Sequence, residues 1–176
     1  MEKVQEVYKG HAWTFGDDIN TESIMPSHVN HDAKKAAEIC LEYYDPEFPK
    51  KAQPGDFVVA GKNFGNSSSR PAASTFRAMQ ISAVICESAA RIFDRSSWAM
   101  GIPVIQCEGI SGFVNKGDEI EVNVVTGLIK NLTTKKEIQA KKTPAIQLEQ
   151  FLRGTGGTVQ WIKDHPEEYE NVMIIK

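Results

Sequence analysis

Residues 65–70 form the run Gly-Asn-Ser-Ser-Ser-Arg, which combines a flexible glycine, three hydroxyl groups and a guanidinium. The run follows an apolar segment, residues 57–61, and precedes Pro71 and two alanines, a composition typical of a helix start. Gly65 permits a tight turn, and serine hydroxyls and backbone N–H groups at such a junction can form a nest for an anion. Arg70 adds a planar fork that matches a carboxylate or a phosphate. The run therefore predicts an anion site, which a carboxylate fits as well as a phosphate.

A structural explanation competes with the anion site, in which Ser69 caps the following helix and the other serines face solvent. One serine alone would fit that explanation, but the complete run at a strand-to-helix junction favours a ligand site. The run is not a Walker A phosphate loop, because it lacks Gly-Lys-Ser/Thr, and Gly61-Lys62 precedes it instead. It is not a nucleophile elbow, because it contains no Gly-x-Ser-x-Gly.

Two of the four histidines, His28 and His31, lie close together in a polar segment of the chain. Contact with a carboxylate and simple exposure to solvent are equally compatible with this pair. A zinc site fits less well, because no third ligand is spaced to join them. A Ser-His-Asp hydrolase can be written with Ser68, His31 and Asp18, but nothing in their spacing supports it.

Alternating strand and helix patterns surround the serine run. We expect strands at residues 6–15, 57–61, 83–88 and 102–107, and helices at residues 32–45, 71–80, 89–101 and 144–154. The alternation over residues 57–107 predicts right-handed βαβ units and a parallel sheet. Residues 118–140 alternate in hydrophobicity around a Thr-Gly pair, which predicts an antiparallel hairpin. Asp32 is the expected N-cap of the first helix, and residues 18–32 are expected to form a structured loop.

The composition is that of an ordinary soluble globular protein, with 41% hydrophobic and 24% charged residues. With no internal repeat and no low-complexity linker, residues 1–176 are expected to form one domain. The formal charge of −3, with acids and bases interspersed, argues against nucleic acid as a partner, because phosphate binding needs a basic face. No apolar stretch reaches membrane-spanning length and the N-terminus has no signal-peptide pattern, so we expect no membrane partner and a cytoplasmic location.

The three cysteines, Cys40, Cys86 and Cys107, are odd in number, widely spaced and set in apolar contexts. They are expected to be buried small hydrophobic residues rather than disulfide partners. The chain contains no Cys-x-x-Cys pair, so a metal cluster, if the function needs one, must be held by another chain.

Three motifs resemble, in order and spacing, the small subunit of isopropylmalate dehydratase, a module that also forms the mobile swivel domain of aconitases. They are GDDINTESIMP (residues 16–26), GKNFGNSSSR (61–70) and AVICESAARIFDRSSWAMGIPVIQC (83–107). The similarity spans roughly residues 9–125, and it is specific because three separate motifs agree. It implies an α/β fold of the aconitase swivel type, with β/β/α layers, parallel βαβ units and an added antiparallel hairpin.

The resemblance implies a lyase that adds or removes water across a double bond in a small di- or tricarboxylic acid. It also implies that a large subunit carries a 4Fe-4S cluster, that this chain holds no metal or cofactor, and that it is active only in the complex. The catalytic base of the family corresponds to Ser68, whose alkoxide needs N–H donors and an arginine for stabilisation. The implied substrate-binding residues are Ser69, Arg70, Ser67, Asn66 and Glu22.

The sequence departs from the family pattern at several of these places. The family usually has Cys-Gly before the two serines, Glu-His after the arginine and Thr-Asp in the first motif. At these three places the sequence has Asn66-Ser67, Pro71-Ala72 and Thr21-Glu22, in the same order. The family's specificity loop is often Gly-Arg-Tyr-Leu-Arg-Thr, whereas here it contains His28, Val29, Asn30 and His31. Because neither the arginine nor the tyrosine is retained, a methylated malate such as 2,3-dimethylmalate, the substrate type of dimethylmaleate hydratase, is a candidate beside an isopropylmalate-like acid.

A second hypothesis follows from the same departures. The chain could be a non-catalytic carboxylate-binding or regulatory module that keeps the fold without the chemistry. Binding of diacids to the isolated chain, with no cluster-bearing partner recovered, would favour this module over the enzyme.

Overall fold

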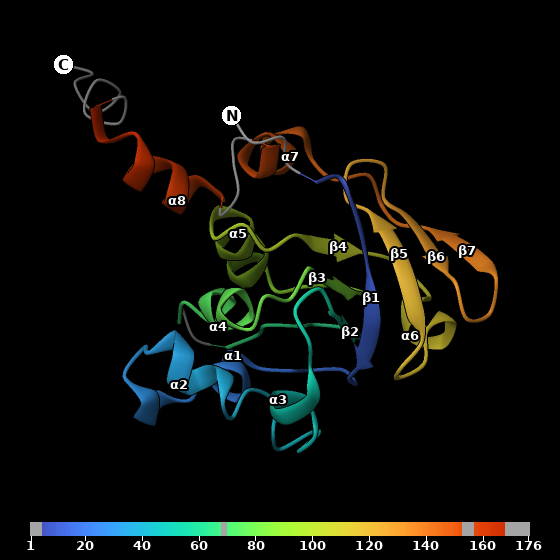
Figure 1. Cartoon of the computed structure of the whole chain (residues 1–176), viewed down its shortest axis with the longest axis horizontal. Coiled ribbons are helices and arrows are strands. Elements are labelled where there is room, and N and C mark those ends of the chain that lie inside the picture. Colours follow the sequence, from blue (N-terminus) through green and yellow to red (C-terminus); the bar gives the residue numbers. More distant parts are fainter. Residues whose placement is uncertain (1–4, 68–69, 153–156, 168–176) are drawn as a thin grey trace.

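The central sheet changes from parallel to antiparallel pairing at its first strand. The computed structural model describes residues 5–67, 70–152 and 157–167, and the strand order within them is β4-β3-β2-β1-β5-β6-β7 (Figure 1). The strands are β1 (Val7–Thr14), β2 (Phe57–Ala60), β3 (Ala83–Cys86), β4 (Val104–Gln106), β5 (Glu119–Asn123), β6 (Leu128–Asn131) and β7 (Lys136–Gln139). Strands β1 to β4 pair in parallel, whereas β1–β5, β5–β6 and β6–β7 are antiparallel. The predicted α/β class with parallel βαβ units is confirmed.

Short helices cover one face of the parallel strands. The helical elements are α1 (Thr21–Ile24), the 3-10 helix η1 (Ser27–Val29), α2 (Ala33–Ala37), α3 (Phe48–Lys51), α4 (Ala73–Ala78), α5 (Arg91–Ala99), α6 (Ile110–Phe113), α7 (Ala145–Leu152) and α8 (Gly157–Asp164). Residues of α1 to α4 share a hydrophobic core with Val58 and Val84 of the sheet. The opposite face, with Phe57 and Ile85, shares a second core with Ile120 of β5, so the sheet curls over itself. This arrangement gives the predicted β/β/α layers.

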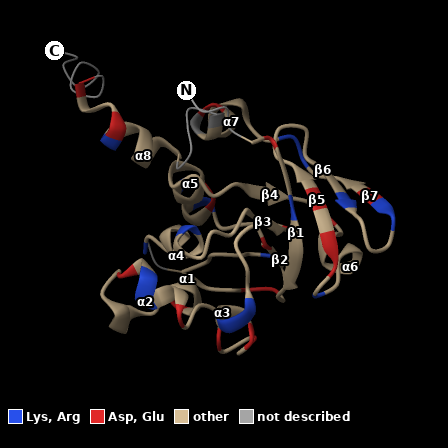
Figure 2. Cartoon of the chain, in the orientation of Figure 1, with Lys and Arg blue, Asp and Glu red and all other residues tan. Residues whose placement is uncertain are grey.

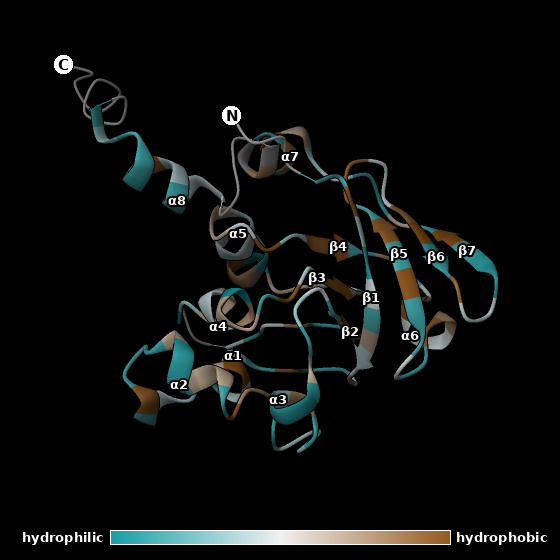
Figure 3. Ribbon diagram, viewed as in Figure 1, coloured by the Kyte–Doolittle hydropathy of each residue, from teal (hydrophilic) through white to brown (hydrophobic). Residues whose placement is uncertain are grey.

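All residues of β2 and β3 are buried, four in each strand. A strand covered on both faces contributes side chains to two cores, and its sequence is therefore continuously apolar instead of alternating. The segments Phe-Val-Val-Ala and Ala-Val-Ile-Cys satisfy this requirement. Figure 3 shows the hydrophobic colour on β3 and β4, whereas β7 carries both colours.

The predicted helix at residues 32–45 is shorter in the structure, where α2 ends at Ala37. Its start is as expected, because the Asp32 carboxylate accepts hydrogen bonds from the N–H groups of Lys34 and Lys35. The helix cannot continue to Tyr44, because Leu41 has φ +55°, a left-handed conformation that ends helices. Leu41 is fully buried and its N–H donates to the Ser23 carbonyl at 2.8 Å, so burial and hydrogen bonding stabilise the unfavourable backbone conformation.

The predicted hairpin at residues 118–140 is a three-stranded meander, because β7 adds to β6. The turn between β6 and β7 contains no glycine, which is why the sequence did not indicate it. Lys135 supplies the left-handed residue at φ +59°, and the Asn131 side chain accepts from the Thr134 N–H at 3.0 Å. The sequence also did not predict five helical elements, namely α1, η1, α3, α6 and α8. Two of them, α1 and η1, lie in the segment that was expected to be a loop.

Cys40, Cys86 and Cys107 are buried and free, as predicted. Burial raises the pKa of Cys86 to about 12 and that of Cys107 to about 11, so these thiols are unreactive at neutral pH. Among residues 5–67, 70–152 and 157–167, no group of three or more His, Cys, Asp or Glu side chains could hold a metal ion. In the same residues no helix has the length and apolarity needed to span a bilayer.

Charged side chains of both signs are interspersed along the ribbon (Figure 2). On the antiparallel half, acidic residues of β5 face basic residues of its neighbours, and Lys130 Nζ of β6 lies 3.0 Å from Glu121 Oε1.

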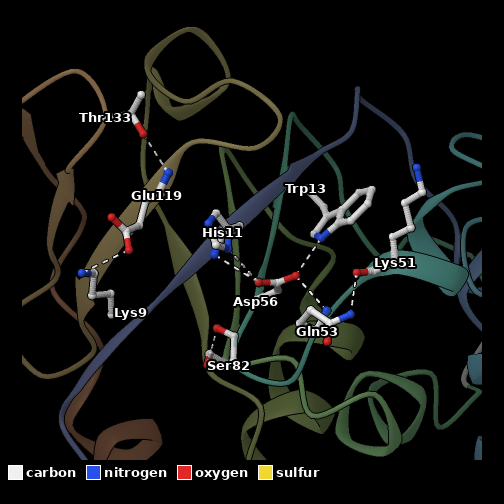
Figure 4. Close-up of polar contacts among 10 residues, drawn as sticks. Lys9, His11, Trp13, Lys51, Gln53, Asp56, Ser82, Glu119 and Thr133 are labelled. Carbon is white, nitrogen blue, oxygen red and sulfur yellow. Dashed lines mark hydrogen bonds and ion pairs between the residues drawn. The ribbon is translucent and has the colours of Figure 1, made fainter.

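A buried carboxylate, Asp56, fastens the start of β2 to β1 (Figure 4). It is 4% exposed and accepts hydrogen bonds from Trp13 Nε1 (2.9 Å), the His11 N–H (3.1 Å) and the Gln53 N–H (2.9 Å). One side chain thus satisfies a buried indole and two backbone donors at the end of the sheet opposite the serine run.

Replacing Asp56 with alanine is expected to lower the free energy of unfolding by about 3–5 kcal/mol, because several donors lose their acceptor at once. Urea denaturation of the purified chain, followed by circular dichroism, measures this change. Glu119→Ala is the matched control: it removes an exposed carboxylate 3.1 Å from Lys9 Nζ, where the expected loss is at most about 1 kcal/mol. Equal denaturation midpoints for the two variants would contradict the assigned role of Asp56.

Candidate functional site

The candidate site lies where three loops leave the carboxyl ends of neighbouring parallel strands. Residues 15–20 follow β1, residues 61–72 follow β2 and residues 87–90 follow β3. In open α/β sheets this edge is the usual place for a ligand, because helix N-termini and loop N–H groups converge there. The described part of the predicted run, up to Ser67, and Arg70 belong to the second loop.

The first two loops are joined along their length. Four backbone hydrogen bonds connect them: Gly61 N to Gly16 O (3.1 Å), Asp18 N to Lys62 O (2.8 Å), Gly65 N to Ile19 O (2.7 Å) and Thr21 N to Asn66 O (3.0 Å). Gly65 has φ +73°, and a Cβ added there would lie 2.2 Å from Cγ of Phe93, so only glycine fits. The turn therefore packs directly against the first turn of α5, as its glycine suggested.

Arg70 and Glu22, which are far apart in the sequence, meet at this edge. Arg70 Nε lies 3.0 Å from Glu22 Oε2, although its N–H is not aligned for a hydrogen bond. Among the residues that the structure describes, Glu22 is the ion-pair partner of Arg70, and the two terminal amino groups of Arg70 make no hydrogen bond. The end-on edge of the guanidinium, which can bind a carboxylate through two nitrogens, is thus left for a ligand.

Glu22 connects the arginine to the predicted specificity loop. Its Oε1 accepts a hydrogen bond from the Ser27 N–H at 2.7 Å, while Oε2 faces Arg70. This backbone hydrogen bond, with smaller contributions from the Ser27 hydroxyl, Arg70 and His28, holds the pKa of the Glu22 carboxyl below its ordinary value. Glu22 is therefore ionised at neutral pH, and its position orients the arginine.

The specificity loop at residues 27–31 presents polar side chains. Val29 is only 6% exposed and packs in the core beneath the loop. His28, Asn30 and His31 are exposed, and the last two adopt left-handed conformations with φ +49° and +62°. The structure thus brings the loop next to Glu22 and Arg70 but turns its one aliphatic residue away from them.

The remaining predicted residues divide into two groups. Ser68 and Ser69 lie outside the described residues. Ser67 is exposed with φ +80°, and Asn66 is partly buried, its side-chain amide donating to the Asn63 carbonyl at 3.1 Å. Asn66 therefore supports the loop from within, a role that its sequence position did not indicate.

Sequence reasoning missed Asn63 and Ser88, which link these loops. The Ser88 hydroxyl accepts a hydrogen bond from the Asn63 N–H at 2.9 Å. The sequence signal for Asn63 was an asparagine shortly after the end of β2. Asparagine adopts the left-handed conformation more readily than most residues with a side chain, so an asparagine at this place indicates a turn.

Comparisons with known proteins agree with this fold. Residues 6–108 match the family described as the aconitase C-terminal domain. The isopropylmalate/citramalate isomerase small subunit of Methanocaldococcus jannaschii is 42% identical over 163 residues, which cover 91% of this chain and 96% of that protein. The 3-isopropylmalate dehydratase small subunit of Caldicellulosiruptor bescii is 41% identical over 160 residues, covering 89% and 95%.

A solved structure gives the same result. The crystal structure of 3-isopropylmalate dehydratase from Methanocaldococcus jannaschii superposes with a TM-score of 0.83 at 32% identity, covering 94% of this chain and 98% of that chain. The chain therefore belongs to the aconitase C-terminal domain family, the swivel-type domains of hydro-lyases. Within it, the chain is of the small-subunit type represented by the 3-isopropylmalate dehydratases, which confirms the resemblance of its three motifs.

Proposed function

We propose that this chain is the small subunit of a hydro-lyase that reversibly hydrates and dehydrates a small 2-hydroxy dicarboxylic acid. It works with a large subunit that carries a 4Fe-4S cluster, in line with the small-subunit names of its relatives. The observation that carries the proposal is Arg70, which Glu22 faces at Nε, while its two terminal amino groups make no hydrogen bond with the described residues. Such a guanidinium is prepared to bind a carboxylate through two nitrogens.

The residues of this chain then bind and deprotonate the substrate. Arg70 and Ser69 hold one carboxylate, with Ser67 and Asn66 at the loop that surrounds it. Ser68 removes the proton next to that carboxylate, and backbone N–H groups and the guanidinium stabilise its alkoxide. Fixing the carboxylate holds the C–H bond against Ser68 and so lowers the entropic part of the barrier.

The cluster belongs to the partner in this proposal. The three cysteines of this chain are buried and free, and none belongs to a group of three or more described His, Cys, Asp or Glu side chains that could hold a metal ion. When bound on the large subunit, the cluster supplies a Lewis acid for departure of the hydroxyl group. This chain contributes the base and the carboxylate site.

The exposed surface beside Arg70 favours a substrate with a small substituent. Ile24 and Met25 are fully buried and Val29 nearly so, while the exposed loop residues are polar. A branched aliphatic group would gain no apolar contact from this loop, whereas a methyl group needs little. We therefore favour a methylated malate, of which 2,3-dimethylmalate is one, over an isopropyl-substituted malate.

Co-expression with the cluster-bearing subunit of the same organism tests both parts of the proposal. The purified complex is assayed with malate, citramalate, 2,3-dimethylmalate and isopropylmalate, and we expect the largest kcat/KM for a methylated acid. A preference for isopropylmalate would overturn the substrate assignment alone. Diacid binding to the chain without turnover, and with no partner recovered, would instead favour the non-catalytic carboxylate-binding module.

A further inference from the structure

We infer that Asn63 is a positioning residue that fastens the three loops of the site together. The inference rests on the proposed function, since it concerns how the loop that carries Ser67 to Arg70 is held for the reaction. Asn63 follows β2 by three residues and is itself exposed.

Three polar groups of Asn63 contact three different parts of the site. Its backbone N–H donates to Ser88 Oγ at 2.9 Å, in the loop after β3. Its side-chain amide donates to Asp18 Oδ1 at 2.7 Å, in the loop after β1. Its carbonyl accepts from the Asn66 side-chain amide at 3.1 Å, within its own loop. One residue therefore links the carboxyl ends of β1, β2 and β3.

The backbone conformation explains why an asparagine is suited to this place. Asn63 and Asp18 both have φ +57°, and asparagine and aspartate adopt the left-handed region more readily than other residues with a side chain. Glycine would adopt the same backbone without strain, but it has no amide to reach Asp18. The position therefore requires both the conformation and the side chain.

The surrounding backbone is packed too tightly to take up a displacement elsewhere. The Lys62 N–H donates to Asp17 Oδ1 at 2.6 Å, and the Asp18 N–H donates to the Lys62 carbonyl at 2.8 Å. A Cβ added to Gly61 would lie 1.9 Å from Asp17 Oδ1. A shift of Asn63 is consequently transmitted to Asn66, next to the serines.

Asn63→Gly in the assembled two-subunit enzyme isolates the side chain, because it retains the left-handed backbone. We expect kcat to fall about tenfold, with a smaller change in KM and an unchanged thermal midpoint, since misplacing a catalytic group by a fraction of an ångström is costly. Gln80→Gly is the matched control. Gln80 is also exposed and left-handed, at φ +58°, but it lies before β3, at the amino ends of the parallel strands. It should leave kcat unchanged.

Exchanging the two side chains of the Asn63–Asp18 hydrogen bond distinguishes a positioning role from a general structural role, because only the former predicts recovery of kcat. Asn63→Asp places two carboxylates against each other and is expected to lower kcat at least as much as Asn63→Gly. Adding Asp18→Asn restores one donor and one acceptor with their positions exchanged, and kcat should recover to within about threefold of the wild-type value. Asp18→Asn alone should remain close to wild type, because an amide oxygen can replace the carboxylate oxygen as acceptor.

The outcomes separate this inference from the proposed function. A wild-type complex that turns over no diacid contradicts the proposed function itself. If the wild-type complex is active, a kcat within twofold of wild type for Asn63→Gly, or no recovery in the double variant, overturns the positioning role of Asn63. Failure of Asn63→Gly to assemble, measured by size-exclusion chromatography, would also overturn it by assigning the residue to assembly.

Discussion

Replacing Ser68 with alanine is expected to lower kcat of the assembled enzyme by at least about 10²-fold, because general acid–base catalysis typically contributes that much or more. The expected reason is loss of the hydroxyl that accepts the substrate proton, with binding through Arg70 retained. Steady-state kinetics of the two-subunit complex should therefore give a KM within a few-fold of wild type.

Ser74→Ala is the control for the Ser68 variant. The Ser74 hydroxyl donates to the Pro71 carbonyl at 2.7 Å at the start of α4, close to the run but with no role assigned in the reaction. Normal rates for Ser74→Ala and a loss for Ser68→Ala would support the base. Near-normal rates for Ser68→Ala in a correctly assembled complex would refute it.

Replacing Arg70 with lysine is the second large effect that we expect. Lysine keeps the charge but has one ammonium group, which cannot face Glu22 and also hold a carboxylate with two parallel hydrogen bonds. We expect kcat/KM to fall about 10²-fold, mainly through a higher KM, because the ground state and the transition state both lose the interaction. Initial rates over a range of substrate concentrations measure the two parameters separately.

Arg77→Lys provides a matched control for this change. Arg77 lies in the last turn of α4, where its Nη1 donates to the Met100 carbonyl and its Nη2 to Gln160 Oε1, both at 3.3 Å. Its replacement should leave KM unchanged. An unchanged KM for Arg70→Lys would show that another group holds the substrate carboxylate.

The parts of the fold set by local chemistry could be predicted from the sequence. The apolar runs that form β2 and β3 are continuous because both faces of these strands are buried, and Asp32 caps α2 as its residue type suggests. The end of α2 could not be predicted, because Leu41 adopts φ +55° only through burial and a hydrogen bond to Ser23. Tertiary packing outweighed helix propensity at that point.

The site was predictable to the extent that it lies in one continuous segment. The serine run and Arg70 stand in sequence order, and the position of the run after β2 followed from the strand pattern. The partners of this segment come from other loops, and only the strand register brings them together. Asp18, for example, lies 45 residues before Asn63, and no local pattern indicates their contact.

The place of β1 in the sheet has a consequence for how the chain acquires its structure. Strand β1, which precedes the other described strands in the sequence, is paired on both sides, with Ala12 opposite Phe57 and Val7 opposite Asn123. Strand β1 can pair on both sides only after β2 and β5 have been synthesised. The sheet is therefore completed late, through contacts between residues distant in sequence. Such a topology implies slow folding, because the pairing of β1 with β5 closes a long stretch of chain.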